Sequence, residues 1–204
     1  YEITTRLVGS EMCIRDRDTS DELREDDYCD KCDLCVRNSL IPSRGQGLEG
    51  SGTILHLVAA PSPADRKTKY VLSGNTGKFI RRILEDKKLL ALSYITSVVK
   101  CGTSQTINAK AITECFPRLQ REIARVEPSM FITYGKDPYF IVSGGKAFPK
   151  GGEGIDVLPN GKIHIYTMSL EYMRKNNDYS YLDRAYDTAV IAYRKFVNQW
   201  VILK

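Results

Sequence analysis

Residues 53–60 read Thr-Ile-Leu-His-Leu-Val-Ala-Ala, a short apolar run with β-branched side chains that is typical of a buried strand. Three more segments share this character, which gives four expected strands: Thr53–Ala60, Tyr94–Lys100, Ser129–Tyr134 and Lys162–Met168. Apolar residues at helical spacing predict helices between and after them: Thr76–Lys88, Asn108–Val126 and Tyr181–Trp200. Strands that alternate with helices predict an α/β fold with a mostly parallel sheet covered on both faces.

The carboxyl ends of these strands are the expected ligand site, because sheets of this class bind their ligands there. The four ends fall near Ala59–Ala60, Ser97–Lys100, Tyr134–Gly135 and Met168–Ser169. The glycine-rich stretch Lys146–Gly154 is expected to form a hairpin or loop that is too irregular to cradle a phosphate.

Charge is distributed unevenly along the 204 residues, whose formal net charge is +5. Residues 18–35 hold eight acids and two bases, so the remainder of the chain is strongly basic. A basic body of this size favours a polyanionic partner, with nucleic acid first, although a merely solvated basic surface fits the same charge. The content of 42% hydrophobic and 27% charged residues excludes a disordered or collagen-like chain.

The chain is long enough for one α/β domain. Residues 9–17 resemble a translated sequencing adapter, so we expect residues 1–17 to be an adapter-derived or disordered tail and the domain to span 18–204. No apolar run approaches the roughly 18 residues of a membrane span, and we expect neither a membrane segment nor a secretory signal.

Three cysteines, Cys29, Cys32 and Cys35, lie close together in an acidic, hydrophilic segment that is poor core material. Cys101 follows the second expected strand, and Cys115 lies on the helix after it. Free thiols in a reducing cytosol are one interpretation, but clustered thiolates favour a cation that offsets their repulsion. Zinc and an iron–sulfur cluster both accept four cysteines, so the residues alone leave that choice open.

The order of several short motifs resembles the iron–sulfur uracil-DNA glycosylases, of the family 4 and 5 type. The matching fragments are Cys29-x2-Cys32, Ala60-Pro61, Ser73-Gly74-Asn75-Thr76-Gly77-Lys78-Phe79, Tyr94-Ile95-Thr96-Ser97-Val98-Val99-Lys100-Cys101, Cys115, Tyr134-Gly135-Lys136-Asp137 and Ile165-Tyr166-Thr167. The resemblance covers roughly residues 28–200 and implies a three-layer α/β/α sandwich around a four-stranded, mostly parallel sheet. It also implies a 4Fe–4S cluster held by Cys29, Cys32, Cys101 and Cys115, with Cys35 spare.

The resemblance implies a pocket that reads a flipped base, yet the matching positions lack the family's reactive groups. The expected base pocket comprises Ala59, Ala60, Pro61, Leu72 and Ser97. Ala59 stands at a glutamate position, Leu72 at a stacking phenylalanine and Ser97 at a base-reading asparagine. Ser169 stands where the family has its catalytic histidine. His56 and His164 lie inside strands and are expected to be satisfied core residues.

Two residues are candidates for substitute catalysis. Asp65 is a candidate for positioning water, although a loop carboxylate that caps a turn is the more common role. Ser169 is a candidate donor to the leaving group. The expected DNA contacts come from loop residues, from the start of one helix and from nearby cations: Ser62, Pro63, Gly74, Asn75, Gly77, Lys78, Arg81 and Lys100.

These observations predict a 4Fe–4S DNA-binding protein of repair or replication with weak or no uracil excision. The alternative is an active DNA glycosylase that hydrolyses the N-glycosidic bond of uracil or another damaged base. A small-molecule or nucleotide hydrolase on the same sheet and a structural partner of a repair or replication complex are two further classes. We expect a monomer in the cytoplasm, bacterial or phage-encoded, with DNA as its partner and replication or repair proteins as further partners.

Overall fold

The computed structural model describes residues 29, 31–32, 45–50, 52–101 and 107–202. The expected tail at residues 1–17 and the spare Cys35 lie outside these residues. In this part of the chain, no helix has both the length and the apolar character that crossing a membrane requires.

A sheet of six strands forms the middle of the molecule, in the order β1-β3-β2-β4-β6-β5. Its four central strands are parallel and match the four expected ones: β3 (Ser93–Ser97), β2 (Ile54–Val58), β4 (Met130–Tyr134) and β6 (Ile163–Thr167). Antiparallel β1 (Gln46–Gly47) and β5 (Gly154–Val157) extend the two edges. The expectation of a four-stranded sheet is therefore wrong at the edges, because a two-residue strand and a four-residue strand that begins where a glycine-rich stretch ends carry little apolar signal.

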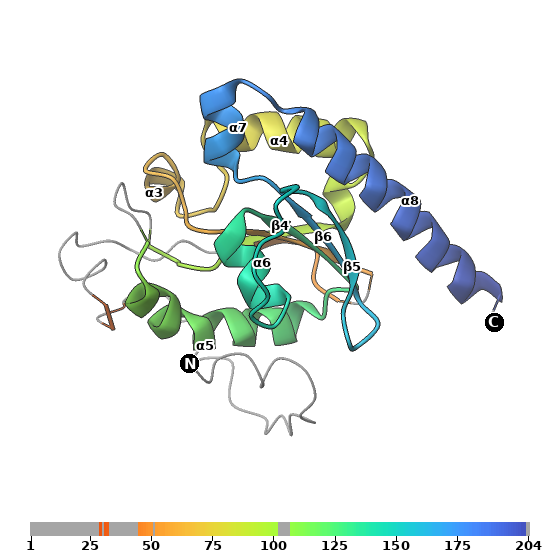
Figure 1. Cartoon of the computed structure of the whole chain (residues 1–204), viewed down its shortest axis with the longest axis horizontal. Coiled ribbons are helices and arrows are strands. Elements are labelled where there is room, and N and C mark those ends of the chain that lie inside the picture. The colour runs from red at the N-terminus through yellow and green to blue at the C-terminus, as the bar shows by residue number, and fades with distance from the viewer. Residues whose placement is uncertain (1–28, 30, 33–44, 51, 102–106, 203–204) are drawn as a thin grey trace.

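Helices cover both faces of the sheet and make three layers (Figure 1). One face packs against α4 (Asn75–Asp86), α7 (Leu170–Asn176) and α8 (Ser180–Ile202). The other face packs against α5 (Ala109–Val126) and α6 (Lys136–Val142). The short α3 (Asp65–Thr68) and a 3-10 turn at Leu90–Leu92 lie in the connections.

Alternation along β2 explains how one strand serves two cores. Ile54 and Val58 join the core beneath α4 and α8, whereas Leu55 and Leu57 join the core beneath α5. Successive side chains of a strand point to opposite faces, so a strand covered on both faces is apolar throughout. His56 is the polar exception, and it is fully buried.

A chain of hydrogen bonds satisfies His56. Ser93 Oγ donates to the Leu89 carbonyl at 2.8 Å, so it must accept from His56 Nε2 at 2.9 Å. His56 Nδ1 then accepts from the Tyr134 hydroxyl at 2.8 Å, and Tyr134 accepts from Tyr186 of α8 at 2.8 Å. Burial lowers the pKa of His56 to about 3, so the imidazole is neutral and its tautomer is fixed by its neighbours. His56 thus has the satisfied core role that the sequence predicts.

Candidate functional site

Short polar side chains and small residues gather at the carboxyl edge of the four parallel strands. Ala59 and Ala60 follow β2, Ser97 ends β3, Gly135 follows β4, and Ser169 lies two residues beyond β6. Parallel pairing places these ends side by side, with Val58 opposite Ser97 and Tyr134 opposite Thr167. The fold therefore brings three expected pocket positions and Ser169 to one edge.

Gly135 permits the close approach of two of these ends. Its φ of +90° favours glycine, and its N–H donates to the Thr167 carbonyl at 2.8 Å. A Cβ at this position would lie 2.8 Å from Ser169 Cβ. A glycine between β4 and α6 therefore lets Ser169 lie directly against the end of β4.

Ser97 is completely buried, and its Oγ has no hydrogen-bond partner among the described residues. A buried hydroxyl without a partner costs free energy, roughly 1–3 kcal/mol, unless something else satisfies it. Ser97 is the last residue of β3, and its Oγ is enclosed by the surrounding side chains and backbone.

Ser169 begins α7 as its N-cap. Its Oγ accepts a hydrogen bond from the Tyr172 N–H at 3.2 Å. Because the cap uses a lone pair of the oxygen, the hydroxyl proton remains available for donation. Ser169 is half-buried at the same edge as Ser97.

Asp65 has a different environment, in which its carboxylate joins two loops. It is 1% exposed. Oδ2 accepts from the Ser62 N–H at 2.8 Å, and Oδ1 accepts from the Ser73 N–H at 2.7 Å, the Ser73 hydroxyl at 2.9 Å and the Gly74 N–H at 3.1 Å. Burial acts to raise the pKa of Asp65, but these donors outweigh it and lower the pKa below its usual value. Both oxygens are thus engaged, which favours the turn-capping role over the positioning of water.

Leu72 lies in the connection that Asp65 fixes. It is buried, and its φ of +55° is in the left-handed region that glycine normally occupies. A Cβ at Gly77 would lie 1.7 Å from the Leu72 carbonyl oxygen, so glycine is required where the first turn of α4 meets this residue. The position of Leu72 is therefore held by α4, but its aliphatic side chain offers no ring for stacking.

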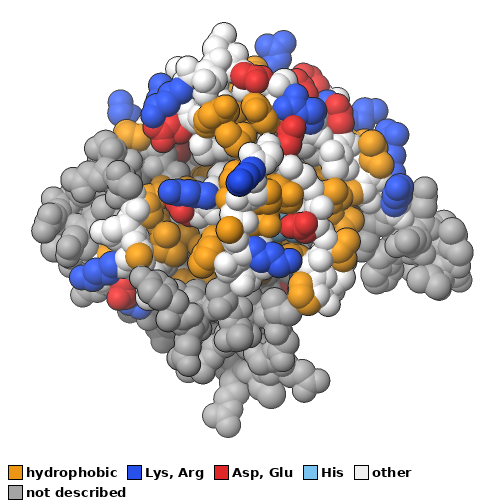
Figure 2. All heavy atoms as spheres, viewed as in Figure 1, with side chains coloured by type: hydrophobic (Ala, Val, Ile, Leu, Met, Phe, Trp, Pro, Cys, Tyr) orange, Lys and Arg blue, Asp and Glu red, His pale blue; other side chains and the backbone are white. Residues whose placement is uncertain are grey.

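The expected DNA contacts divide into exposed and buried groups. Exposed residues at the start of α4 and in the preceding loop are Ser62, Pro63, Asn75 and Lys78, whereas Gly74 is half-buried and Gly77 buried. Arg81 is half-buried and donates to the carbonyls of Leu72 and Val71, each at 3.4 Å. On the face that Figure 2 shows, Lys and Arg side chains are scattered among apolar and acidic ones.

Lys100 is 3% exposed and lies in a buried network rather than on the surface. Its ammonium group pairs with Glu122 of α5 and donates to Thr96 Oγ1 at 2.6 Å. Glu122 also accepts from Thr96 Oγ1 at 2.7 Å and from the Tyr94 hydroxyl at 2.9 Å. This arrangement gives Lys100 no route to a phosphate. Glu122 is not among the residues expected from the sequence, where its one signal is its place on α5 two turns after Cys115.

The four cysteines of the expected cluster form no disulfide with one another and lie in one region of the molecule. Cys32, Cys101 and Cys115 belong to the apolar core beneath α5, and Cys29 packs against it. Burial raises the pKa of Cys115; Cys32 and Cys29 raise it further, while the Lys100 N–H lowers it.

The donor chemistry of these thiols fits a thiophilic metal or cluster, because four uncrosslinked sulfurs from three parts of the chain share one core. Among the described residues, however, no three Cys, His, Asp or Glu side chains converge in an arrangement that could hold a metal ion. The residues thus suit the group in kind and region, and ligation requires their side chains to draw together.

His164 is buried, and its Nε2 makes a 2.8 Å hydrogen bond with Thr133 Oγ1. Its Nδ1 has no partner within the described part of the chain, and burial lowers its pKa to about 4. Neither histidine lies at the carboxyl edge, because both occupy the interiors of strands.

Comparisons with known proteins agree with this architecture. The model of the uracil DNA glycosylase superfamily matches residues 52–191. A type-4 uracil-DNA glycosylase of Sulfurisphaera tokodaii is 28% identical over 147 residues, which are 68% of this chain and 62% of that protein. One of Saccharolobus solfataricus is 28% identical over 124 residues, 57% of this chain and 54% of that protein. The matched segments thus span less than two thirds of each relative's length. The match over most of the sheet and its helices shows that this chain belongs to the uracil DNA glycosylase superfamily.

Proposed function

We propose that this protein is a 4Fe–4S DNA-binding protein of repair or replication that excises uracil slowly or not at all. The carboxyl edge carries the proposal, because it presents Ala59, Ser97 and Ser169 where the family resemblance implies a carboxylate, an amide and an imidazole. The two matched relatives bear the name type-4 uracil-DNA glycosylase, which supports DNA as the ligand.

The chemistry explains why these three positions matter. Cleavage of an N-glycosidic bond leaves positive charge on the sugar and negative charge on the departing base. A carboxylate offsets the first charge and a donor stabilises the second, and removing one such interaction commonly costs about 3–4 kcal/mol. Ala59 offers neither group, and both oxygens of Asp65 are already engaged. Several losses in one pocket do not add simply, yet together they leave little stabilisation of the transition state.

DNA contacts are proposed for the start of α4. The amides of this first turn and the positive end of the helix dipole suit a phosphate, and Lys78 is exposed beside them. Ser62 and Pro63 are exposed in the loop that Asp65 joins to Gly74, so both loops present one surface. Arg81 supports this surface from within, by donating to the carbonyls of Leu72 and Val71.

The proposed cluster ligands are Cys29, Cys32, Cys101 and Cys115. When bound, an iron–sulfur cluster would cross-link the segment around Cys29 to the end of β3 and to α5. Anaerobically purified protein should then be brown, with broad visible absorption, and Cys101→Ser should lose the colour. A colourless protein that carries one zinc per chain would exclude this assignment.

Single-turnover cleavage of uracil- and hypoxanthine-containing oligonucleotides tests the catalytic part. We expect little cleavage by the wild type and a rise of about a hundredfold or more in Ser97→Asn/Ser169→His, which restores an amide and an imidazole. Ser97→Ala is the matched control and should leave the low rate unchanged. Wild-type rates equal to those of ordinary repair glycosylases would refute the proposal.

An active glycosylase is the second candidate, and two observations favour it. Ser97 Oγ is buried without a partner among the described residues, and Ser169 keeps a proton that it can donate. These two hydroxyls can hydrogen-bond a base and its leaving anion. In that case Ser97→Ala and Ser169→Ala would each lower a measurable cleavage rate.

A further inference from the structure

An apolar groove lies on the face of the sheet that α8 covers, away from the carboxyl edge. It encloses about 560 Å³ between the β5–β6 hairpin and α8. Ser129, just before β4, and Ile163, the first residue of β6, line it. The groove therefore lies toward the amino ends of the parallel strands, whereas the proposed DNA site lies at their carboxyl ends.

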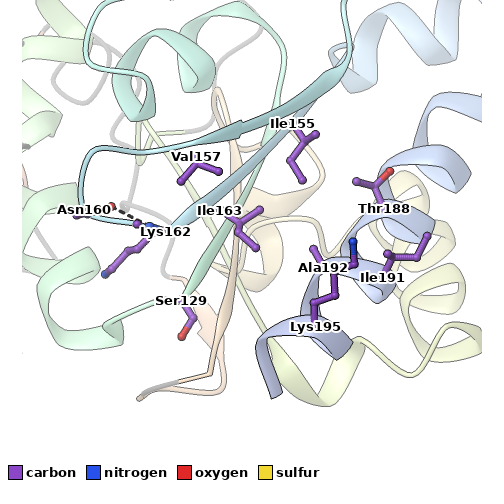
Figure 3. Close-up of a pocket in the computed structure, with 11 residues that line it drawn as sticks. Ser129, Ile155, Val157, Asn160, Lys162, Ile163, Thr188, Ile191, Ala192 and Lys195 are labelled. Atoms are coloured by element: carbon purple, nitrogen blue, oxygen red, sulfur yellow. Dashed lines mark hydrogen bonds between the residues drawn. The ribbon is translucent and has the colours of Figure 1, made fainter. Parts of the chain in front are cut away.

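The walls of this groove are unusually apolar for an exposed surface. Val157 is 73% exposed, Ile191 58% and Ile155 50%. Figure 3 shows Ile155 and Val157 on the hairpin across from Ile191 and Ala192 on α8. Apolar side chains that gather in one groove mark an interaction site, whereas isolated exposed ones need no explanation.

The strand beside the groove is also open at its outer edge. β5 is the last strand in the order, and within the described residues it pairs only with β6. Ile155 and Val157 alternate with half-buried Asp156, so one face of an edge strand carries its exposed apolar side chains. An unpaired edge offers backbone N–H and C=O groups to an extended peptide.

The charges in the groove select the kind of peptide. Two lysines line it, Lys162 and Lys195, and among the residues that the structure describes no carboxylate does. A second copy that docked through the same groove would add two further lysines and no carboxylate of its own groove, so it offers no complementary charge. An acidic partner meets the lysines with complementary charge.

We infer that this groove binds an extended peptide of another protein, with alternating apolar side chains and flanking Asp or Glu residues. The peptide would lie along β5, with its apolar side chains over Val157 and Ile191. Its carboxylates would meet Lys162 and Lys195. This surface is independent of the proposed DNA site and of its catalytic activity.

Selection of random dodecapeptides displayed on phage, using the full chain, tests the inference. Enriched peptides should alternate apolar and other residues and carry more Asp and Glu than the starting library. A synthetic copy labelled with fluorescein should bind in anisotropy assays, and Val157→Asp should weaken it about tenfold or more. Lys195→Glu should weaken peptide binding by a smaller factor. A peptide in which Lys replaces each Asp and Glu should not bind the wild-type protein.

Controls separate binding from folding. Val157 is exposed, so its substitution should leave circular dichroism and DNA affinity unchanged. Phe140→Asp, on the exposed side of α6 outside the groove, should leave peptide affinity unchanged. The inference would be overturned if no peptide is enriched, or if Val157→Asp binds the enriched peptides as tightly as the wild type does. Sedimentation showing a dimer that Val157→Asp dissociates would do so too, by assigning the groove to a second copy.

Discussion

At the scale of single residues, buried polar groups differ in whether the fold itself satisfies them. His56 has partners on both ring nitrogens, and Asp65 has donors on both oxygens. Ser97 Oγ, at the carboxyl edge, and His164 Nδ1, inside β6, have none among the described residues. Because folded proteins satisfy nearly all buried polar atoms, these two atoms call for partners that the described residues do not supply.

Acidification should destabilise the protein through His56. Burial, helped by the charge of Arg81, lowers its pKa from 6.5 to about 3. The unfolded histidine takes up a proton below pH 6.5 while the folded one does not, so stability is lost as the pH falls toward the folded pKa. From pH 7 to pH 5, the free energy of unfolding in urea should fall by about 2 kcal/mol through this residue.

His56→Gln is the matched control, because an amide keeps one donor and one acceptor without titrating. His56→Gln should remove about half of the decrease in the free energy of unfolding between pH 7 and pH 5. The other half comes from His164, whose pKa burial lowers to about 4. A slope that His56→Gln leaves unchanged would contradict this assignment.

At the scale of elements, polar side chains connect segments that apolar packing alone would leave loosely joined. Asp65 connects the loop after β2 to the start of α4, and Glu122 connects α5 to β3 through Lys100 and Tyr94. Both connections lie next to proposed ligand sites. The positions of these sites therefore depend on hydrogen bonds of side chains that do not themselves contact the ligand.

Asp65→Asn should lower the free energy of unfolding by about 2–3 kcal/mol, because an amide turns a donor toward N–H groups that need an acceptor. Affinity for DNA should fall with it, since both proposed contact loops meet at this carboxylate. Urea unfolding and fluorescence anisotropy measure the two effects. The opposite pattern, with unchanged stability and abolished base excision, would show that Asp65 acts on water instead.

Lys100→Met should lower the free energy of unfolding by about 3–5 kcal/mol, because it leaves the Glu122 carboxylate buried without its counter-charge. Lys100→Met/Glu122→Gln should recover most of that loss. Urea unfolding of the wild type, both single variants and the double variant forms the required cycle. If the loss of the double variant equals the sum of the two single losses, Lys100 and Glu122 are not energetically coupled.

At the scale of the whole molecule, the parallel sheet could be predicted from sequence, whereas its edges and polar connections could not. The four central strands are continuous apolar runs, so their signal is local. β5 lies beside a glycine-rich loop and is stabilised by pairing with β6. The burial of Lys100 depends on a carboxylate 22 residues away on a packed helix, which composition and spacing do not reveal. Asp65 likewise receives most of its donors from backbone groups, which every residue carries.

DNA affinity should fall steeply with salt, because phosphate contacts release counterions. Lys78→Ala should weaken binding to all sequences similarly and reduce the slope of log affinity against log salt by about 1. Lys88→Ala, just beyond the other end of α4, is the control and should change neither. Affinity independent of salt would show that the start of α4 has another role.

The direction shared by the four central strands gives the molecule two chemically different poles. One pole presents helix starts and small polar groups, and the other presents the apolar groove. A protein that held DNA at the first pole and a peptide at the second could do so without the two ligands competing for space. When both are bound to one rigid body, the protein that carries the peptide is held close to the DNA. Its local concentration there rises without any conformational change in this chain.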